Sequence, residues 1–180
     1  STFSFQLSVQ SENGKKRNPA ELTGIKRVLL VDDIADSRTA VGEILENMGI
    51  EVCDVENGFL ALEKLTKEKD FDILLVDYQM PYMNGIDVLT YIRKKFSGKS
   101  RTLPVIILHS STESNILREI RKNDEWVAGL IKPVNKKNII TVLTTFAKQK
   151  KQNEQISEEK TVETGHSQHK TVRTGSGPLI

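Results

Sequence analysis

The stretch FDILLVDYQMPYMNG, residues 71–85, decides the fold of this chain. Its four consecutive aliphatic residues, 73–76, predict a strand that is buried on both faces, as in a parallel sheet. Asp77 follows the strand directly, and Pro81 and Gly85 predict a turn just beyond it. The carboxylate of Asp77 should therefore lie at the carboxyl end of the strand, where open α/β sheets place their ligand crevices. We interpret Asp77 as a residue placed for chemistry.

Four more apolar segments predict strands, and each predicted strand is followed by a segment with helical spacing of its apolar residues. The predicted strands besides 73–77 cover residues 26–31, 51–55, 104–108 and 126–131. The predicted helices cover residues 36–48, 58–69, 85–96, 113–122 and 136–147. Five strand–helix alternations predict an α/β fold, a doubly wound five-stranded parallel sheet with helices on both faces.

The chain divides into four predicted parts, of which residues 25–148 form the main domain. Residues 1–10, STFSFQLSVQ, alternate strictly between apolar and polar, which predicts a half-buried strand left from an upstream domain. The polar residues 11–24 then form a linker. Residues 149–180 lack apolar periodicity and are expected to form a disordered linker or tail.

Composition narrows the class of protein. The net charge of +2 comes without a concentrated basic stripe, so we expect no nucleic-acid partner. The single cysteine, Cys53, excludes an internal disulfide and a thiolate cluster for zinc. Apolar runs reach only about five residues against the roughly 20 that span a bilayer, and we expect no signal peptide. We therefore expect a soluble, cytoplasmic chain without direct membrane contact.

Polar side chains follow four of the predicted strands. They are Asp32 and Asp33 after the first strand, Asp77 after the third, His109 and Ser110 after the fourth, and Lys132 after the fifth. Parallel strands bring these ends to one edge of the sheet, where three carboxylates repel each other unless a cation is present. Their oxygen atoms suit Mg²⁺, and Lys132 adds a charge that holds a phosphoryl oxygen. A nucleophilic carboxylate, a divalent metal and a lysine together indicate phosphoryl transfer through an aspartyl phosphate.

Four ordered motifs resemble the receiver domains of two-component signalling. The motifs are VDD at 31–33, DYQMPYMNG at 77–85, LPVIIL at 103–108 and KP at 132–133. The resemblance implies a flavodoxin-like sheet in the order 2-1-3-4-5. It also implies a phosphoacceptor that takes a phosphoryl group from the phosphohistidine of a kinase and passes it on or hydrolyses it.

The resemblance also assigns a role to each matching residue. Asp77 would be the phosphoacceptor, Asp33 a direct Mg²⁺ ligand, and Asp32 a ligand through water. Gln79 would offer its backbone carbonyl to the metal. Lys132 would bridge the phosphoryl group and precede a cis peptide bond.

Two positions depart from the family pattern. His109 stands where the family usually has Thr or Ser, so either a ring nitrogen of His109 donates to the phosphoryl group or Ser110 takes over the hydroxyl role. Gly129 stands where the family has an aromatic residue that switches on phosphorylation. The phosphoacceptor site looks intact, whereas the aromatic residue that usually responds to phosphorylation is absent.

Residues 1–10 resemble the last strand of a histidine-kinase ATP-binding domain. The chain would then be part of a hybrid sensor histidine kinase whose catalytic domain lies outside this chain. Whether that parent kinase is anchored in a membrane stays open. The expected partners are the phosphohistidine domain of a kinase and a further receiver or histidine phosphotransfer domain. Whether the chain is itself an enzyme and whether it forms a homodimer stay open.

Two other functions compete with the phosphoacceptor. A pseudo-receiver would bind partners without being phosphorylated, which the residues at His109 and Gly129 leave open. A phosphatase with an aspartate nucleophile ranks last. Its chemistry needs a second Asp two residues after the nucleophile for acid–base help, and the chain has Gln79 there.

Overall fold

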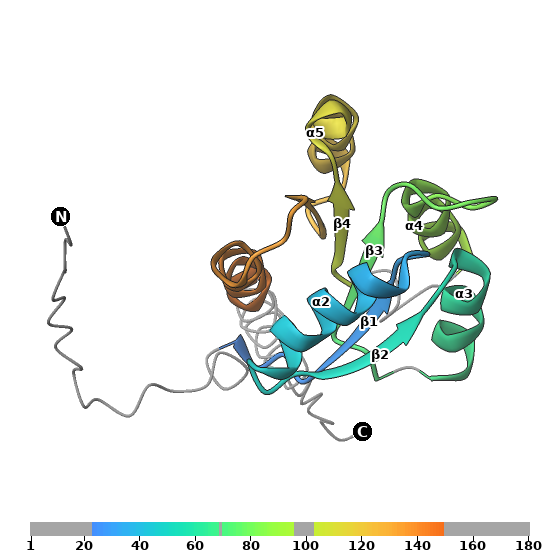
Figure 1. Cartoon of the computed structure of the whole chain (residues 1–180). Helices are drawn as coiled ribbons and strands as arrows, with labels where there is room; N and C mark the ends of the chain where they lie inside the picture. The colour runs from blue at the N-terminus through green and yellow to red at the C-terminus, as the bar shows by residue number, and fades with distance from the viewer. Residues whose placement is uncertain (1–22, 69, 96–102, 150–180) are drawn as a thin grey trace, which may run out of the picture.

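The computed structural model describes residues 23–68, 70–95 and 103–149 (Figure 1). These residues form one parallel sheet with the strand order β2-β1-β3-β4-β5. Its strands are β1 (Arg27–Val31), β2 (Glu51–Val55), β3 (Ile73–Asp77), β4 (Val105–His109) and β5 (Val127–Ile131). The predicted doubly wound sheet and its order are confirmed.

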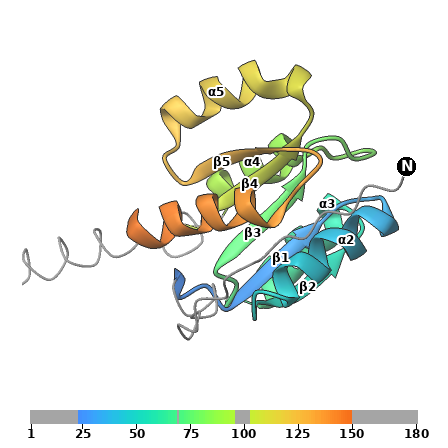
Figure 2. The ribbon, with the colours of Figure 1, turned by 60° about the vertical axis from the view of Figure 1, so that its left-hand side comes forward.

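Helices cover both faces of the sheet (Figures 1 and 2). The helices with described bounds are α2 (Ala35–Glu46), α3 (Gly58–Lys67), α4 (Gly85–Lys95), the 3₁₀ turn η2 (Ser111–Glu113) and α5 (Ser114–Asn123). A final helix covers residues 136–149 of the described chain. Residues of α3, α4 and α5 pack on one face of the sheet, and residues of α2 and the final helix pack on the other.

The central strand β3 supplies side chains to both cores. In β3, Leu74 and Val76 belong to the core under α3 and α4, while Ile73 and Leu75 belong to the core under α2 and the final helix. All five residues of β3 are buried. Alternating side chains thus serve both faces, which explains the uninterrupted aliphatic run that predicted this strand.

Two helix ends follow the expected chemistry. Asn84 caps α4, since its Oδ1 accepts the backbone N–H groups of Ile86 at 2.8 Å and Asp87 at 3.0 Å. Gly49 has a φ of 79°, the left-handed conformation of a residue that ends a helix. Asn84 thus begins α4, and Gly49 lets the chain leave α2 toward β2.

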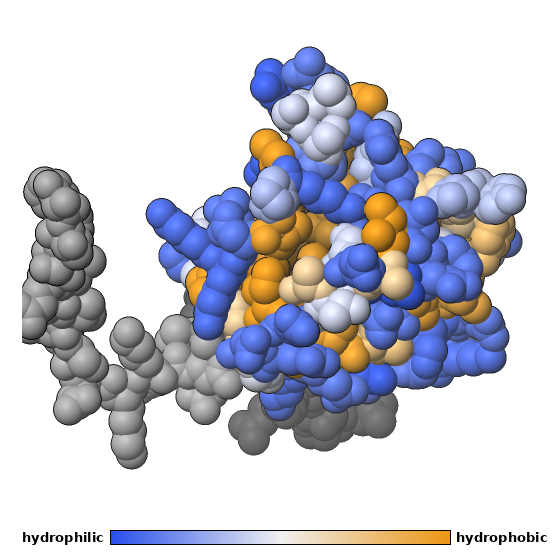
Figure 3. Space-filling view, in the orientation of Figure 1, coloured by the Kyte–Doolittle hydropathy of each residue, from blue (hydrophilic) through white to orange (hydrophobic). Residues whose placement is uncertain are grey.

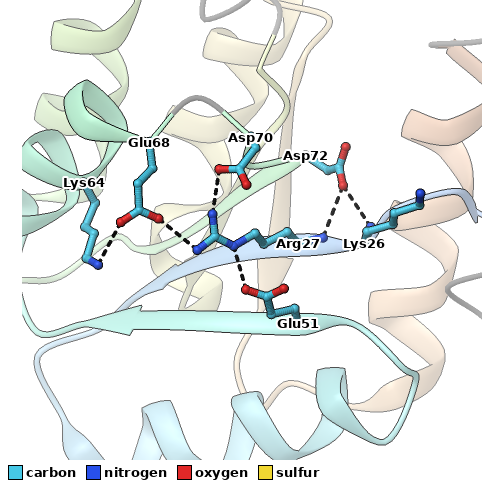
Figure 4. A network of polar contacts seen from close by, with 7 residues as sticks. All are labelled: Lys26, Arg27, Glu51, Lys64, Glu68, Asp70 and Asp72. Carbon is cyan, nitrogen blue, oxygen red and sulfur yellow. Dashed lines mark hydrogen bonds and ion pairs between the residues drawn. The ribbon is translucent and has the colours of Figure 1, made fainter.

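A charged cluster surrounds Arg27 where β1 begins (Figure 4). Its guanidinium bonds Glu51 at 2.8 Å, Glu68 at 2.8 Å and Asp70 at 2.6 Å, and lies 4.5 Å from the ring centre of Phe71. These contacts join the starts of β1 and β2 to the connection between α3 and β3. They fix the amino end of the sheet and leave its carboxyl end for other groups.

Most of the terminal segments lie outside the described residues. The predicted strand at 1–10, the linker up to residue 22 and the tail from residue 150 are in this part of the chain. Within the described ranges, no helix combines the length and the apolar character needed to cross a bilayer.

Candidate functional site

Three carboxylates meet at the carboxyl ends of β1 and β3. One oxygen each of Asp32, Asp33 and Asp77 lies within 4.8 Å of the others, so that these residues could hold one metal ion together. Asp32 and Asp77 are buried, and Asp33 is exposed to solvent. The three carboxylates thus meet at the edge of the sheet, as the sequence predicted. An all-oxygen donor set that opens to solvent fits Mg²⁺, which keeps several water ligands.

Lys132 completes the cluster from the end of β5. Its Nζ lies 2.9 Å from Oδ2 of Asp32 and 2.9 Å from Oδ1 of Asp77. The backbone N–H of Lys132 donates to the carbonyl of His109 at 2.8 Å, and its peptide bond to Pro133 is cis. The ammonium group therefore bridges two carboxylates from a fixed backbone position.

Asp32 is the most constrained of the three carboxylates. Its Oδ1 accepts the backbone N–H of Ile34 at 2.9 Å, and its Oδ2 accepts the hydroxyl of Ser37 at 2.6 Å. Burial alone would raise the pKa of Asp32, but the hydrogen bonds from Lys132, Ser37 and Ile34 outweigh it and lower the pKa. Asp32 therefore stays ionised and serves as a fixed negative charge.

Asp77 has the opposite electrostatic balance. Burial raises the pKa of its carboxyl, and the charges of Asp32 and Asp33 raise it further, although Lys132 acts in the other direction. For Lys132, burial would lower the pKa, but its bonds to Asp32 and Asp77 raise it. Asp77 is thus a partly uncompensated carboxylate that a cation would stabilise.

The chain after Asp77 turns tightly against the strand that it leaves. The N–H of Tyr78 donates to the carbonyl of Leu108 at 2.8 Å, and the N–H of Gly85 donates to the carbonyl of Tyr78 at 3.1 Å. A Cβ atom on Gly85 would lie 2.6 Å from the carbonyl oxygen of Asp77. Only glycine leaves room for this approach, which explains the Asn84-Gly85 sequence at the start of α4.

The side chains of His109 and Ser110 lie apart from this bonding network. Nδ1 of His109 lies 2.6 Å from the carbonyl oxygen of Ser110, and its Nε2 lies over Gly129 on β5. The hydroxyl of Ser110 donates to Glu113. In the described chain, no hydrogen bond or ion pair joins either side chain to Asp77. The structure places both candidates at the end of β4 but does not bond them to the acceptor.

Sequence reasoning missed Glu113. Its Oε1 accepts the side-chain N–H of Gln79 at 2.8 Å, and its Oε2 accepts the backbone N–H of Ser110 at 2.7 Å. The signal was present in the sequence, because Ser110 and Glu113 have the S-x-x-E spacing of a capping box. The side chain of Gln79, two residues after Asp77, is therefore tied to the start of α5.

Comparison with known proteins identifies the family. Residues 28–144 match the family model described as the response regulator receiver domain. This chain belongs to that family. The receiver is a module of two-component signalling, and the sheet order and the acidic cluster described above agree with this assignment.

Relatives of the receiver include both sensor kinases and response regulators. It is 29% identical over 116 residues to the sensor histidine kinase AruS of Pseudomonas aeruginosa, covering 64% of this chain and 11% of AruS. It is 33% identical over 113 residues to the two-component response regulator ORR3 of Oryza sativa subsp. indica, covering 62% of this chain and 83% of ORR3. The match thus spans most of the response regulator but only a small part of the sensor kinase.

Solved structures show the same architecture. The chemotaxis protein CheY4 of Vibrio cholerae superposes with a TM-score of 0.60 at 27% identity, over 68% of this chain and 98% of that chain. A response regulator receiver domain from Clostridium thermocellum superposes with a TM-score of 0.63 at 23% identity, over 71% of this chain and 98% of that chain.

Proposed function

We propose that this receiver accepts a phosphoryl group on Asp77 from a phosphohistidine. A carboxylate oxygen of Asp77 attacks phosphorus, the P–N bond breaks, and the imidazole leaves and takes up a proton. The product is an aspartyl phosphate, which a later acceptor or water attacks at phosphorus. The observation that carries this proposal is the cluster of Asp32, Asp33 and Asp77 around the ammonium group of Lys132.

The residues of the site divide the work. Asp33 and Asp77 would bind Mg²⁺ directly, Asp32 through water, and Gln79 through its backbone carbonyl. Bound Mg²⁺ would neutralise charge on the phosphoryl oxygens. Lys132 has three N–H donors, so it has one left for a phosphoryl oxygen while it contacts two carboxylates. The residues of the chain therefore supply the nucleophile, the counter-charge and the metal ligands.

The donor reaches Asp77 over an apolar surface. Ile34, at the start of α2 and next to Asp33, is 57% exposed. Figure 3 shows apolar surface between α2 and the final helix, within largely hydrophilic surroundings. An exposed aliphatic residue beside an acidic site suits a protein that packs there while its imidazole enters. The proposed partners are a kinase phosphohistidine domain and, in a relay, a phosphotransfer domain or second receiver.

Intact-mass measurement tests the proposal. The chain is incubated with Mg²⁺ and phosphoramidate, and we expect an adduct of one phosphoryl group. Asp77→Asn should abolish the adduct. Asp70→Asn, which removes a carboxylate from the cluster around Arg27, should retain it. Absence of an adduct with every small-molecule and protein donor would favour the pseudo-receiver.

A further inference from the structure

Glu113 joins two segments of the chain that meet beside the acidic site. One oxygen accepts the side-chain N–H of Gln79, from the loop after β3, at 2.8 Å. The other accepts the backbone N–H of Ser110, from the end of β4, at 2.7 Å, together with the hydroxyl of Ser110. Glu113 is only 7% exposed. A buried carboxylate is retained where its hydrogen bonds compensate for lost hydration, and those of Glu113 hold both segments.

The two oxygens of Glu113 have separable roles. Oε2 closes the capping box with Ser110 at the start of η2. Oε1 accepts the hydroxyl of the neighbouring Thr112 at 3.1 Å and reaches across to Gln79, whose side chain is otherwise on the exposed surface of the loop. Removal of Glu113 breaks both contacts, whereas truncation of Gln79 breaks only the second. The two substitutions therefore distinguish a capping role from a role in the loop.

The bond to Gln79 lies where the loop has few other side-chain anchors. The loop is fixed at its start by the backbone bond from Tyr78 to Leu108 and at its end by Gly85. Between them, over the described residues 79–83, the bond from Gln79 to Glu113 is the only side-chain hydrogen bond. The backbone carbonyl oxygens of residues 79–83 are uncharged, and they follow Asp77 closely in the chain. If a metal binds at Asp77, the positions of these oxygens would affect how well it is coordinated.

We propose that Glu113 is a positioning residue: through Gln79 it holds the segment after Asp77 in the shape that completes the Mg²⁺ site. The inference rests on the proposed function, because it concerns the metal that phosphoryl transfer needs.

A double-mutant cycle on Mg²⁺ affinity tests the inference. Gln79→Ala, Glu113→Ala and the double variant are titrated with Mg²⁺ alone by isothermal calorimetry. We expect each single variant to bind Mg²⁺ about three- to tenfold more weakly, the effect of one lost hydrogen bond. The double variant should be no weaker than Glu113→Ala, because both substitutions break the same bond. Glu119→Gln, which removes an exposed charge paired with Lys122 on the same helix, should bind as the wild type does.

Each outcome decides a different question. Wild-type affinity in Gln79→Ala, or losses that multiply in the double variant, would overturn the positioning role while leaving the proposed function in place. A wild-type chain that binds no Mg²⁺ would overturn both. Because Glu113→Ala also loses a helix cap, its melting curve is recorded. Gln79→Ala, whose side chain is exposed, keeps the test valid if Glu113→Ala does not fold.

Discussion

The imidazole of His109 lies over Gly129, and a Cβ atom on Gly129 would come within 2.8 Å of Nε2 of His109 and 3.1 Å of Leu117. His109 and Gly129, the two residues that depart from the family pattern, are thus in direct contact. The ring of His109 occupies the space directly above β5 that a side chain at position 129 would need. A residue with a side chain fits at position 129 only if His109 moves.

We therefore expect Gly129→Ala to destabilise the receiver by about 1–3 kcal/mol, the usual effect of overpacking. In a His109→Ala background the same substitution should be much less harmful, since the ring is gone. Urea unfolding of the four proteins measures the free energies. Equal effects of Gly129→Ala in both backgrounds would show that the two residues are not coupled.

Two other glycines, Gly85 and Gly42, distinguish close backbone contact from chain flexibility. Gly85→Ala would drive a Cβ atom to 2.6 Å from the backbone of Asp77, so we expect a loss of about 1–3 kcal/mol. Gly42, within α2, has nothing within 4 Å of its Cβ position. Gly42→Ala should therefore stabilise the helix by roughly 0.5–1 kcal/mol. Thermal unfolding of both variants tests the contrast, and a stable Gly85→Ala would contradict the close approach.

Mg²⁺ should stabilise the receiver, because it relieves repulsion among three carboxylates. At about 100 times its dissociation constant, a ligand specific for the folded state adds about 2.7 kcal/mol to the free energy of unfolding. Asp33→Ala should abolish this gain and leave the metal-free protein little changed, since Asp33 is exposed. Melting curves with Mg²⁺ and with EDTA provide the measurement. An Asp33→Ala variant that is still stabilised by Mg²⁺ would remove Asp33 from the ligand set.

Asp77 should give the metal-free protein a specific pH dependence. Its pKa is raised in the folded state, so its ionisation destabilises the fold as pH rises through the folded pKa, and the penalty vanishes below the ordinary value of 3.8. Asp77→Asn should therefore melt a few degrees above the wild type near neutral pH. That difference should shrink on acidification. Asp32, whose pKa is lowered, loses its stabilising effect at low pH in both proteins alike. A difference that grows on acidification would reverse the sign assigned to Asp77.

Ile34 should matter for a protein donor and not for a small one. Burying an isoleucine contributes about 1.5–3 kcal/mol, so Ile34→Asp should slow transfer from a phosphohistidine domain by about tenfold or more. Phosphorylation by phosphoramidate should stay unchanged, because that donor needs no docking surface. Ile116→Asp, on α5 and 48% exposed, serves as the matched control. Equal slowing by both donors would place the effect of Ile34 in the site itself.

The sequence predicted the acidic cluster because its position depends only on strand ends. Asp32, Asp77 and Lys132 each follow a buried strand, and a parallel sheet brings such ends together whatever the details of the loops. The direction of His109 was not predictable in the same way. It depends on the pairing of β4 with β5, which sets Ile107 beside Gly129 and brings the ring of His109 over the glycine. The hydrogen bond from Gln79 to Glu113 joins the loop after β3 to η2 across 34 residues of sequence. The spacing of apolar residues does not predict a polar contact over such a separation.

The contact of Lys132 with both Asp32 and Asp77 gives the site an internal counter-ion. The ammonium group already offsets part of the negative charge that Mg²⁺ would neutralise. An arriving Mg²⁺ ion would compete with the ammonium group of Lys132 for the two carboxylates. The Mg²⁺ concentration that fills the proposed site would therefore depend in part on how strongly Lys132 holds the two aspartates.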